Sequence, residues 1–156
     1  MSTFLRGTGW RCIPVRIMPR KATYVLDDQI GYVLRRATQR HLAIFSETIP
    51  DITTTQFAVL ARLAQMGPLS QNLLGRETAM DAATIKGVVD RLAKQGLLII
   101  AAHPVDRRRL TVTLSDEGLA LFAKYRDAAI AVSAQTLGPL SQTERSTLLA
   151  LLGRLV

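Results

Sequence analysis

The chain has 156 residues, the length of one ordinary domain with or without a helical appendage. Hydrophobic residues make up 48% of it, which excludes a disordered chain, and only 5% are aromatic, which predicts an aliphatic core. The formal net charge of +8 and the sequence pI of about 10.6 favour a polyanionic partner, either nucleic acid or an anionic membrane surface. The single cysteine, Cys12, excludes a disulfide within the chain and fits a reducing cytoplasm, and no apolar run reaches membrane-spanning length.

The first 23 residues are predicted to form a flexible basic arm. They contain five basic residues and no acidic one. They lack the continuous apolar stretch of a secretory signal, and two interpretations stay open: an organelle transit peptide, or a start placed too early, with Met18 as the natural initiator and residues 1–17 as an extension. Residues 53–114 form a second basic region, with eight basic and four acidic residues.

Four helices are predicted before residue 96, because apolar residues recur there at three- and four-residue spacing. Their approximate ranges are 27–49, 56–66, 71–78 and 82–95. Each is preceded by side chains that can accept a hydrogen bond from a free backbone N–H at the start of the helix; these are Asp27, Thr53 to Thr55, Ser70 and Asp81. Pro50, Gly67-Pro68 and Gly96 separate the helices, because proline restricts the residue before it and glycine tolerates the left-handed conformation that ends a helix.

The period of the sequence then changes. Residues 97–102 are short and apolar, and residues 110–114 alternate with period two, which predicts the two strands of a β-hairpin around a polar tip that contains a proline. Ser115 can cap a long helix over residues 116–137, and Ser141 with Glu144 forms a capping box for a last helix that reaches about residue 155.

The order helix, short helix, turn, helix and hairpin predicts a winged helix-turn-helix, whose second helix can enter the major groove of DNA. The tip of the hairpin carries Asp106 and three consecutive arginines, Arg107, Arg108 and Arg109, which suit phosphates or a narrow minor groove; the alternative is an ordinary solvated turn. The predicted fold class is mainly α with a minor β part (α+β). A winged helix-turn-helix domain at 51–115 is flanked by helical dimerisation segments at 24–50 and 116–156.

Five segments, in this order, resemble the MarR family of transcription regulators. They are Leu69-Ser70-Gln71-Asn72-Leu73, Ala83-Thr84-Ile85-Lys86, Val89 to Leu97, Asp106-Arg107-Arg108, and Val112 to Ser115 with Gly118. The resemblance covers about residues 26–155. The first helix, with Leu34-Arg35-Arg36-Ala37 and Gln39-Arg40-His41, also resembles the branch of that family that senses aromatic acids or their thioesters.

The resemblance implies a set of DNA-contacting residues. They are Ser70, Gln71, Ala83, Thr84, Lys86, Arg91, Asp106, Arg107, Arg108 and Arg109. Ala83, Thr84 and Lys86 stand at positions that usually face bases, and Arg91 stands at one that often meets phosphate. For Lys86 the alternative is an ordinary surface lysine.

In the wing, the resemblance implies that Asp106 braces Arg108, and that Arg107 and Arg108 enter the minor groove. Two positions depart from the family, because Ala82 and Gly87 stand where many members carry basic or polar residues. Gly87 would then permit a close approach to DNA or to another helix. Elsewhere in the same helix, one interpretation of Asp90 is an ordinary surface pair with Arg91 or with Lys94.

A possible effector site lies on the first helix. His41 falls near the centre of its apolar stripe, with Arg40 on the flank, and a polar ring there needs a partner. One interpretation is a bond to a backbone carbonyl or a stack across a dimer interface. The other is that His41, with Arg40 and Arg36, binds an aromatic carboxylate.

The sequence therefore predicts a homodimeric DNA-binding repressor of an aromatic-compound catabolic or efflux operon. It would bind double-stranded DNA at a palindromic operator and be released by a small aromatic carboxylate or thioester. A regulator without an effector is one alternative, and a basic membrane-surface or scaffold protein is another. An enzyme is disfavoured because the sequence has two histidines, no Gly-rich phosphate loop, no serine elbow and no metal-ligand cluster, so we expect no cofactor and no metal.

Overall fold

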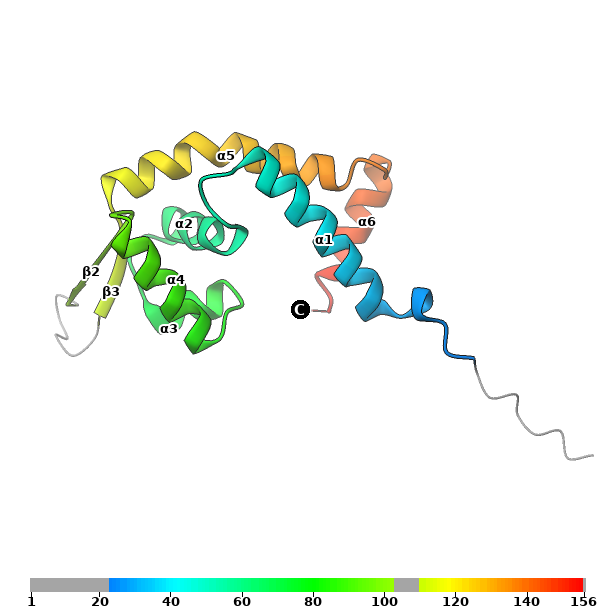
Figure 1. The fold of residues 1–156 in the computed structure, drawn as a ribbon, viewed down its shortest axis with the longest axis horizontal. Coiled ribbons are helices and arrows are strands. Elements are labelled where there is room, and N and C mark those ends of the chain that lie inside the picture. The colour runs from blue at the N-terminus through cyan, green and yellow to red at the C-terminus, as the bar shows by residue number, and fades with distance from the viewer. Residues whose placement is uncertain (1–22, 103–109, 156) are drawn as a thin grey trace, which may run out of the picture.

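The computed structural model describes residues 23–102 and 110–155, so the basic arm up to residue 22 and the four wing residues Asp106 to Arg109 lie outside the described residues. The elements in chain order are the 3-10 turn η1 (Leu26–Asp28), α1 (Ile30–Thr48), α2 (Thr54–Met66), β1 (Leu69–Ser70), α3 (Gln71–Glu77), α4 (Ala82–Lys94), β2 (Leu98–Ala102), β3 (Leu110–Leu114), α5 (Asp116–Thr136) and α6 (Gln142–Leu152). The lobe formed by α2, α3, α4 and the sheet lies beside the first half of α5, α1 packs against α5, and α6 folds away from its far end (Figure 1).

Most of the predicted helix starts are confirmed by side-chain caps. Ser70, Asp81 and Ser115 each accept a hydrogen bond from the backbone N–H three residues later, and Ser141 forms the predicted capping box with Glu144. Thr53 forms a second capping box, with Gln56, which the sequence reading did not foresee.

Three predicted boundaries are wrong. Asp27 does not cap α1, because it lies inside the 3-10 turn η1, and Gln29 is the residue before α1. The second helix begins at Thr54 rather than Gln56, since Thr53 alone supplies the cap. The last helix ends at Leu152, not at about residue 155.

The sheet has three antiparallel strands in the order β1-β3-β2. The predicted hairpin is confirmed, with Leu98 opposite Leu114 and Ala102 opposite Leu110. The sequence reading missed β1, whose two residues are too few to show any alternation; Leu69 pairs with Val112. This short strand ties the start of α3 to the wing, so the helix-turn-helix and the hairpin form one unit.

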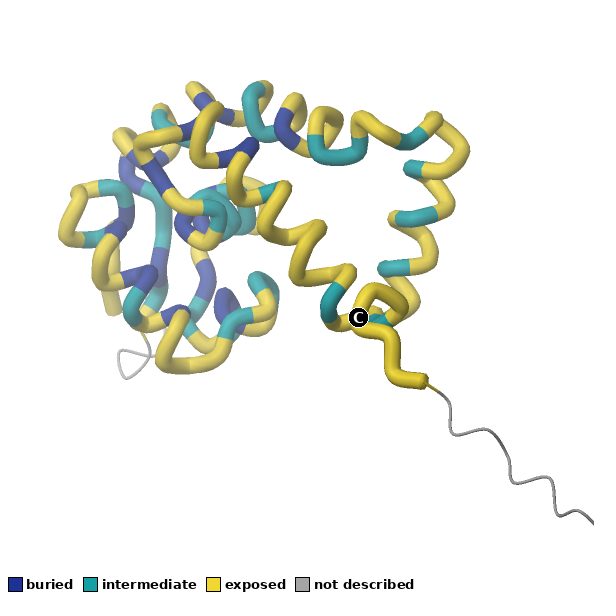
Figure 2. Tube along the Cα trace, turned by 45° about the vertical axis from the view of Figure 1, so that its right-hand side comes forward, coloured by how far each residue is buried: buried dark blue, intermediate teal, exposed yellow. Residues whose placement is uncertain are grey.

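The core lies almost entirely in the lobe and where α5 and the end of α1 meet it (Figure 2). Its fully buried side chains are Ile49, Val59, Leu60, Leu74, Ile85, Val88, Val89, Leu92, Val112 and Val132. By contrast, the N-terminal half of α1 and all of α6 have no buried residue. Large apolar side chains are exposed there, for example Ile30 at 63% and Leu149 at 59%, so this face of the single chain is uncovered.

The end of α4, the root of the hairpin and the start of α5 are tied together. Gly96 has a φ of 76° and ends α4 as predicted, with the Leu97 N–H donating to the Leu92 carbonyl oxygen at 3.0 Å. The Ser115 hydroxyl donates to the Gly96 carbonyl oxygen at 2.6 Å and accepts the Gly118 N–H at 3.0 Å. A β-carbon on Gly118 would collide with the carbonyl oxygen of Leu97, so only glycine fits this contact.

Within the described ranges, no helix is both long enough and apolar enough to cross a membrane.

Candidate nucleic-acid interface and effector site

The α4 helix presents one apolar and one polar face. Ile85, Val88, Val89 and Leu92 are buried in the lobe. The predicted base-facing residues Ala83, Thr84 and Lys86 are all exposed, as is Arg91. All four candidates are therefore accessible to solvent, and their contacts to DNA stay predictions.

The start of α4 is fixed by its cap. The Asp81 carboxylate accepts the Thr84 backbone N–H at 2.7 Å, and this hydrogen bond lowers the pKa of Asp81 below its ordinary value. The cap leaves the Thr84 side chain exposed.

Lys86 and Asp90 form an ion pair along the helix at 2.6 Å. The surface pair of Asp90 with Arg91 or Lys94, one interpretation of the sequence, is therefore wrong in its partner, because Asp90 pairs with the lysine four residues before it. Both side chains are more than half exposed, so the pair adds little stability and can open when another anion approaches.

Ser70 and Gln71 lie at the start of α3 rather than on the exposed face of α4, and both are half-buried. The Ser70 hydroxyl already accepts the Leu73 N–H at 3.3 Å. The wing candidates Asp106, Arg107, Arg108 and Arg109 lie outside the described residues, so their contacts stay predictions from the sequence.

Two of the three effector candidates meet at the C-terminal turn of α5. The Arg40 guanidinium donates to the carbonyl oxygens of Thr136 at 3.2 Å and of Gln135 at 3.3 Å, where a cation is favoured at a helix C-terminus. His41 Nδ1 lies 3.0 Å from the Thr136 hydroxyl. Because that hydroxyl donates to the Val132 carbonyl oxygen at 2.8 Å, it accepts from His41, and the proton is assigned to Nδ1.

The third candidate, Arg36, does not join them. Its guanidinium lies 3.7 Å from the exposed carboxylate of Asp27 and 5.7 Å from the ring centroid of Tyr32. The structure of one chain thus brings Arg40 and His41 together and leaves Arg36 on the side of η1.

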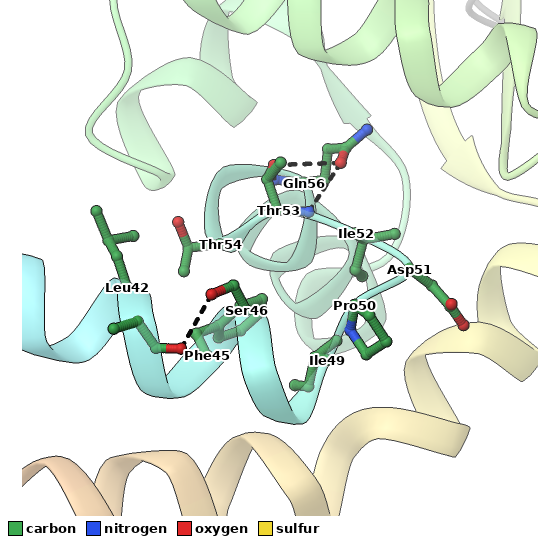
Figure 3. Close-up of a pocket in the computed structure, with 11 residues that line it drawn as sticks. Leu42, Phe45, Ser46, Ile49, Pro50, Asp51, Ile52, Thr53, Thr54 and Gln56 are labelled. Carbon is green, nitrogen blue, oxygen red and sulfur yellow. Dashed lines mark hydrogen bonds between the residues drawn. The ribbon is translucent and has the colours of Figure 1, made fainter.

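A pocket of about 490 Å³ lies between the C-terminal half of α1, the linker after it and the start of α2 (Figure 3). Its lining is partly apolar, with Phe45, Ile49 and Ile52, and partly polar, with Ser46 and Asp51 among others. None of the effector candidates lines it. His41 lies near one lining residue, Phe45, whose ring centroid is 6.3 Å from the centroid of the imidazole.

Asp51, on the pocket wall, is held by two residues of α5. Lys124 Nζ lies 2.9 Å from Asp51 Oδ2, and the Tyr125 hydroxyl donates to the same oxygen. The Tyr125 hydrogen bond, and after it Lys124, hold the pKa of Asp51 below its ordinary value. Sequence reasoning missed this cluster, since no local pattern connects residues so far apart in the chain.

The cluster of Asp51, Lys124 and Tyr125 makes the stability of the protein depend on pH. A lowered folded-state pKa contributes stability above the unfolded-state value of about 3.9, and that stability is lost as pH falls through the folded-state pKa. We expect Asp51→Asn to be less stable than the parent protein at pH 7, with the difference narrowing below about pH 4. Urea unfolding followed by circular dichroism between pH 3 and 7 measures it.

Tyr125→Phe serves as the matched variant, because it keeps the carboxylate of Asp51 and removes its main donor. Its stability deficit should narrow in the same direction as pH falls. A deficit of Asp51→Asn that is equal at every pH would contradict the role given to the carboxylate charge.

Among the described residues, no group of three or more histidine, cysteine, aspartate or glutamate side chains is placed to hold a metal ion.

Comparison with known proteins decides the family. The profile of the MarR family matches residues 51–109. The HTH-type transcriptional repressor NicR of Pseudomonas putida is 38% identical over 135 residues, which cover 85% of both chains. The chain belongs to the MarR family. The resemblance seen in the sequence is confirmed, and the protein is a MarR-family transcription regulator.

Solved structures of MarR-type regulators share the fold. A probable transcriptional regulator from Pseudomonas aeruginosa is 53% identical, with a TM-score of 0.82, over 85% of this chain and 100% of that one. BpsR of Bordetella bronchiseptica is 39% identical, also with a TM-score of 0.82, over 85% and 96% of the two chains. The winged helix-turn-helix fold class predicted from the sequence is therefore confirmed.

Proposed function

We propose that this MarR-family regulator is a homodimeric repressor that binds a palindromic operator through α4 and the wing. The observation that carries the proposal is the exposed face of α4, where Thr84, Lys86 and Arg91 are all open to solvent while the other side of the helix is buried. The wing arginines Arg107 and Arg108 would add contacts in the neighbouring minor groove.

Dimerisation would use the uncovered apolar face of the helices outside the lobe. Its exposed side chains include Ile30, Val33 and Leu34 on α1 and Leu149 and Leu151 on α6. Pairing these faces across a two-fold axis would bury them and place two copies of α4 about one turn of DNA apart, roughly 34 Å. The palindrome of the operator would then mirror the symmetry of the dimer.

The effector is proposed to be a small aromatic carboxylate or its thioester, and the target an operon for the breakdown or export of such compounds. In BpsR, DNA binding is regulated by 6-hydroxynicotinic acid. In this chain, Arg40 supplies a cation and His41 a ring nitrogen at the contact between α1 and α5. A ligand that displaces these contacts would change how α1 sits on α5 and so shift the population away from the DNA-bound form.

The deciding experiment is fluorescence anisotropy of the full chain on labelled duplex DNA from upstream of its own gene, against a scrambled duplex at the same stated salt concentration. Each titration is repeated with benzoate, 6-hydroxynicotinate, hydroxycinnamates and their thioesters. Tight, sequence-dependent binding reversed by one compound supports the whole proposal. If binding is specific but no compound reverses it, the effector part of the proposal is wrong. If the protein binds both duplexes equally, the proposed operator binding is wrong.

The same assay distinguishes operator binding from the alternative of a membrane-surface protein. A chain that begins at Met18 lacks most of the basic arm. It should keep its operator affinity if α4 and the wing bind DNA. Loss of DNA binding, together with arm-dependent binding to anionic vesicles, would favour the membrane-surface function instead.

His41→Ala is expected to abolish effector-induced release without weakening operator binding, because His41 lies on α1 and away from the exposed face of α4. Anisotropy with a fixed operator and increasing effector measures both quantities. Gln39→Ala is the matched control, since Gln39 is an exposed residue of the same helix. Release by the same effector concentration in His41→Ala and in the parent protein would refute the assignment.

A further inference from the structure

The guanidinium of Arg91 lies over Gly87, one turn nearer the start of α4. A β-carbon at residue 87 would stand 3.5 Å from Nη1, 3.8 Å from Nη2 and 3.9 Å from Cζ of Arg91. This direction is the normal one, because side chains in an α-helix lean toward its N-terminus and cover the residue four positions earlier. Any side chain at residue 87 that extends beyond a β-carbon toward Arg91 would fill the space that the guanidinium occupies.

The contact moves the charge of Arg91 across the surface of the helix. The four buried residues of α4 define its inner face. At 100° per residue, Gly87 and Ala83 lie near the middle of the opposite, exposed face, whereas Arg91 starts from its edge. By lying over Gly87, the guanidinium reaches toward the middle of the exposed face.

We propose that Arg91 reads a guanine in each half-site and that Gly87 is the specificity-determining residue that puts it there. This rests on the proposed operator binding through α4. A cation at the edge of a recognition helix meets phosphate, but one at its middle faces the floor of the groove. A guanidinium there matches the O6 and N7 acceptors of guanine with two parallel N–H donors, a geometry that lysine lacks.

The cation on the other side of the exposed face is differently placed. Lys86 is paired with Asp90 at 2.6 Å, so its charge is partly neutralised within the helix. Lys94 is exposed on the same face, but it starts about two turns beyond Gly87. Discrimination between base pairs beside Gly87 therefore falls to Arg91. Lys86 is left to contact phosphate or to reach a base only after it parts from Asp90.

The size of residue 87 gives a graded test. Alanine fits, because its β-carbon makes an ordinary contact with Arg91 at 3.5 Å or more. Leucine does not fit, because its branch would occupy the place of the guanidinium and push Arg91 back to the edge of the helix. Both substitutions favour the helix over glycine, so a difference between them does not come from loss of helical structure.

The experiment measures the affinity of the full chain for its operator and for a set of symmetric single-base-pair variants of it, at two salt concentrations. Arg91→Ala should lose about 10- to 100-fold in affinity for operators with guanine at one symmetric position and lose the preference there. Gly87→Ala should keep the preference. Gly87→Leu should lose it although Arg91 is present, and adding Arg91→Ala to Gly87→Leu should change little more.

Two results would overturn the inference while leaving operator binding intact. In the first, Arg91→Ala weakens binding to every sequence alike and lowers the salt slope by about one, as expected for a phosphate contact. In the second, Gly87→Leu retains the full base preference of the parent chain. If the parent chain itself has no preference for any operator, the proposed function fails, and the inference fails with it.

Discussion

Alanine at position 118 is expected to lower the free energy of unfolding by about 3 kcal/mol, the upper part of the range for overpacking. The added β-carbon would collide with the carbonyl oxygen of Leu97, which is backbone and cannot turn away as a side chain can. The collision falls where the hairpin joins α5, so the Ser115 contacts to Gly96 and Gly118 would be disturbed as well. Urea unfolding of Gly118→Ala, followed by circular dichroism, measures the loss.

Gly31→Ala is the matched control. Gly31 also lies in the first turn of a helix, and a β-carbon there would have no neighbour within 4 Å. It should leave stability unchanged or raise it slightly, by up to about 0.5 kcal/mol. Equal stabilities for the two variants would show that the close approach of Gly118 to Leu97 does not constrain the fold.

The double change Arg107→Ala and Arg108→Ala is expected to lower operator affinity roughly 100-fold at physiological salt, since two contacts of about 1–3 kcal/mol each are removed. Each lost contact to DNA charge should also reduce the slope of log affinity against log salt by about one. Anisotropy titrations at several salt concentrations measure both effects. The control is Arg126→Ala, which removes an exposed arginine of α5 that pairs with Asp127. If it costs as much affinity as the wing change, the loss reflects net charge and not the wing.

The helices and the hairpin could be predicted because their signals are local. Each capping side chain accepts the N–H of the residue three positions later, so the cap can be recognised in the sequence next to the helix that it starts. The four caps are Ser70, Asp81, Ser115 and Ser141. The predicted cap at Asp27 is wrong because Asp27, although a common capping residue close before the apolar stripe, lies in a separate 3-10 turn.

The parts that could not be predicted depend on contacts between distant segments. Asp51 meets Tyr125, and Arg40 meets the carbonyl oxygens at the end of α5, only after the lobe and the long helices have packed. The sequence does mark His41 as a polar residue that needs a partner, but it cannot name Thr136 as that partner. The exposed face of α4 can be predicted from the helical spacing of its apolar residues. The position of the Arg91 guanidinium over Gly87 is seen only in the structure.

The two attachments of the α1 segment to α5 have a mechanical consequence. Arg40 and His41 hold α5 at Thr136, and Asp51 holds it at Lys124 and Tyr125, roughly 18 Å away along the helix axis. Because these contacts lie at two separate points along α5, a rotation of α1 against α5 about either point would break the contacts at the other. In the proposed dimer, the distance between the two copies of α4 would then depend on the angle at which the two copies meet. In the proposed dimer, a change of effector or of operator spacing would therefore act where the two copies meet, without altering any residue that we propose to face a base.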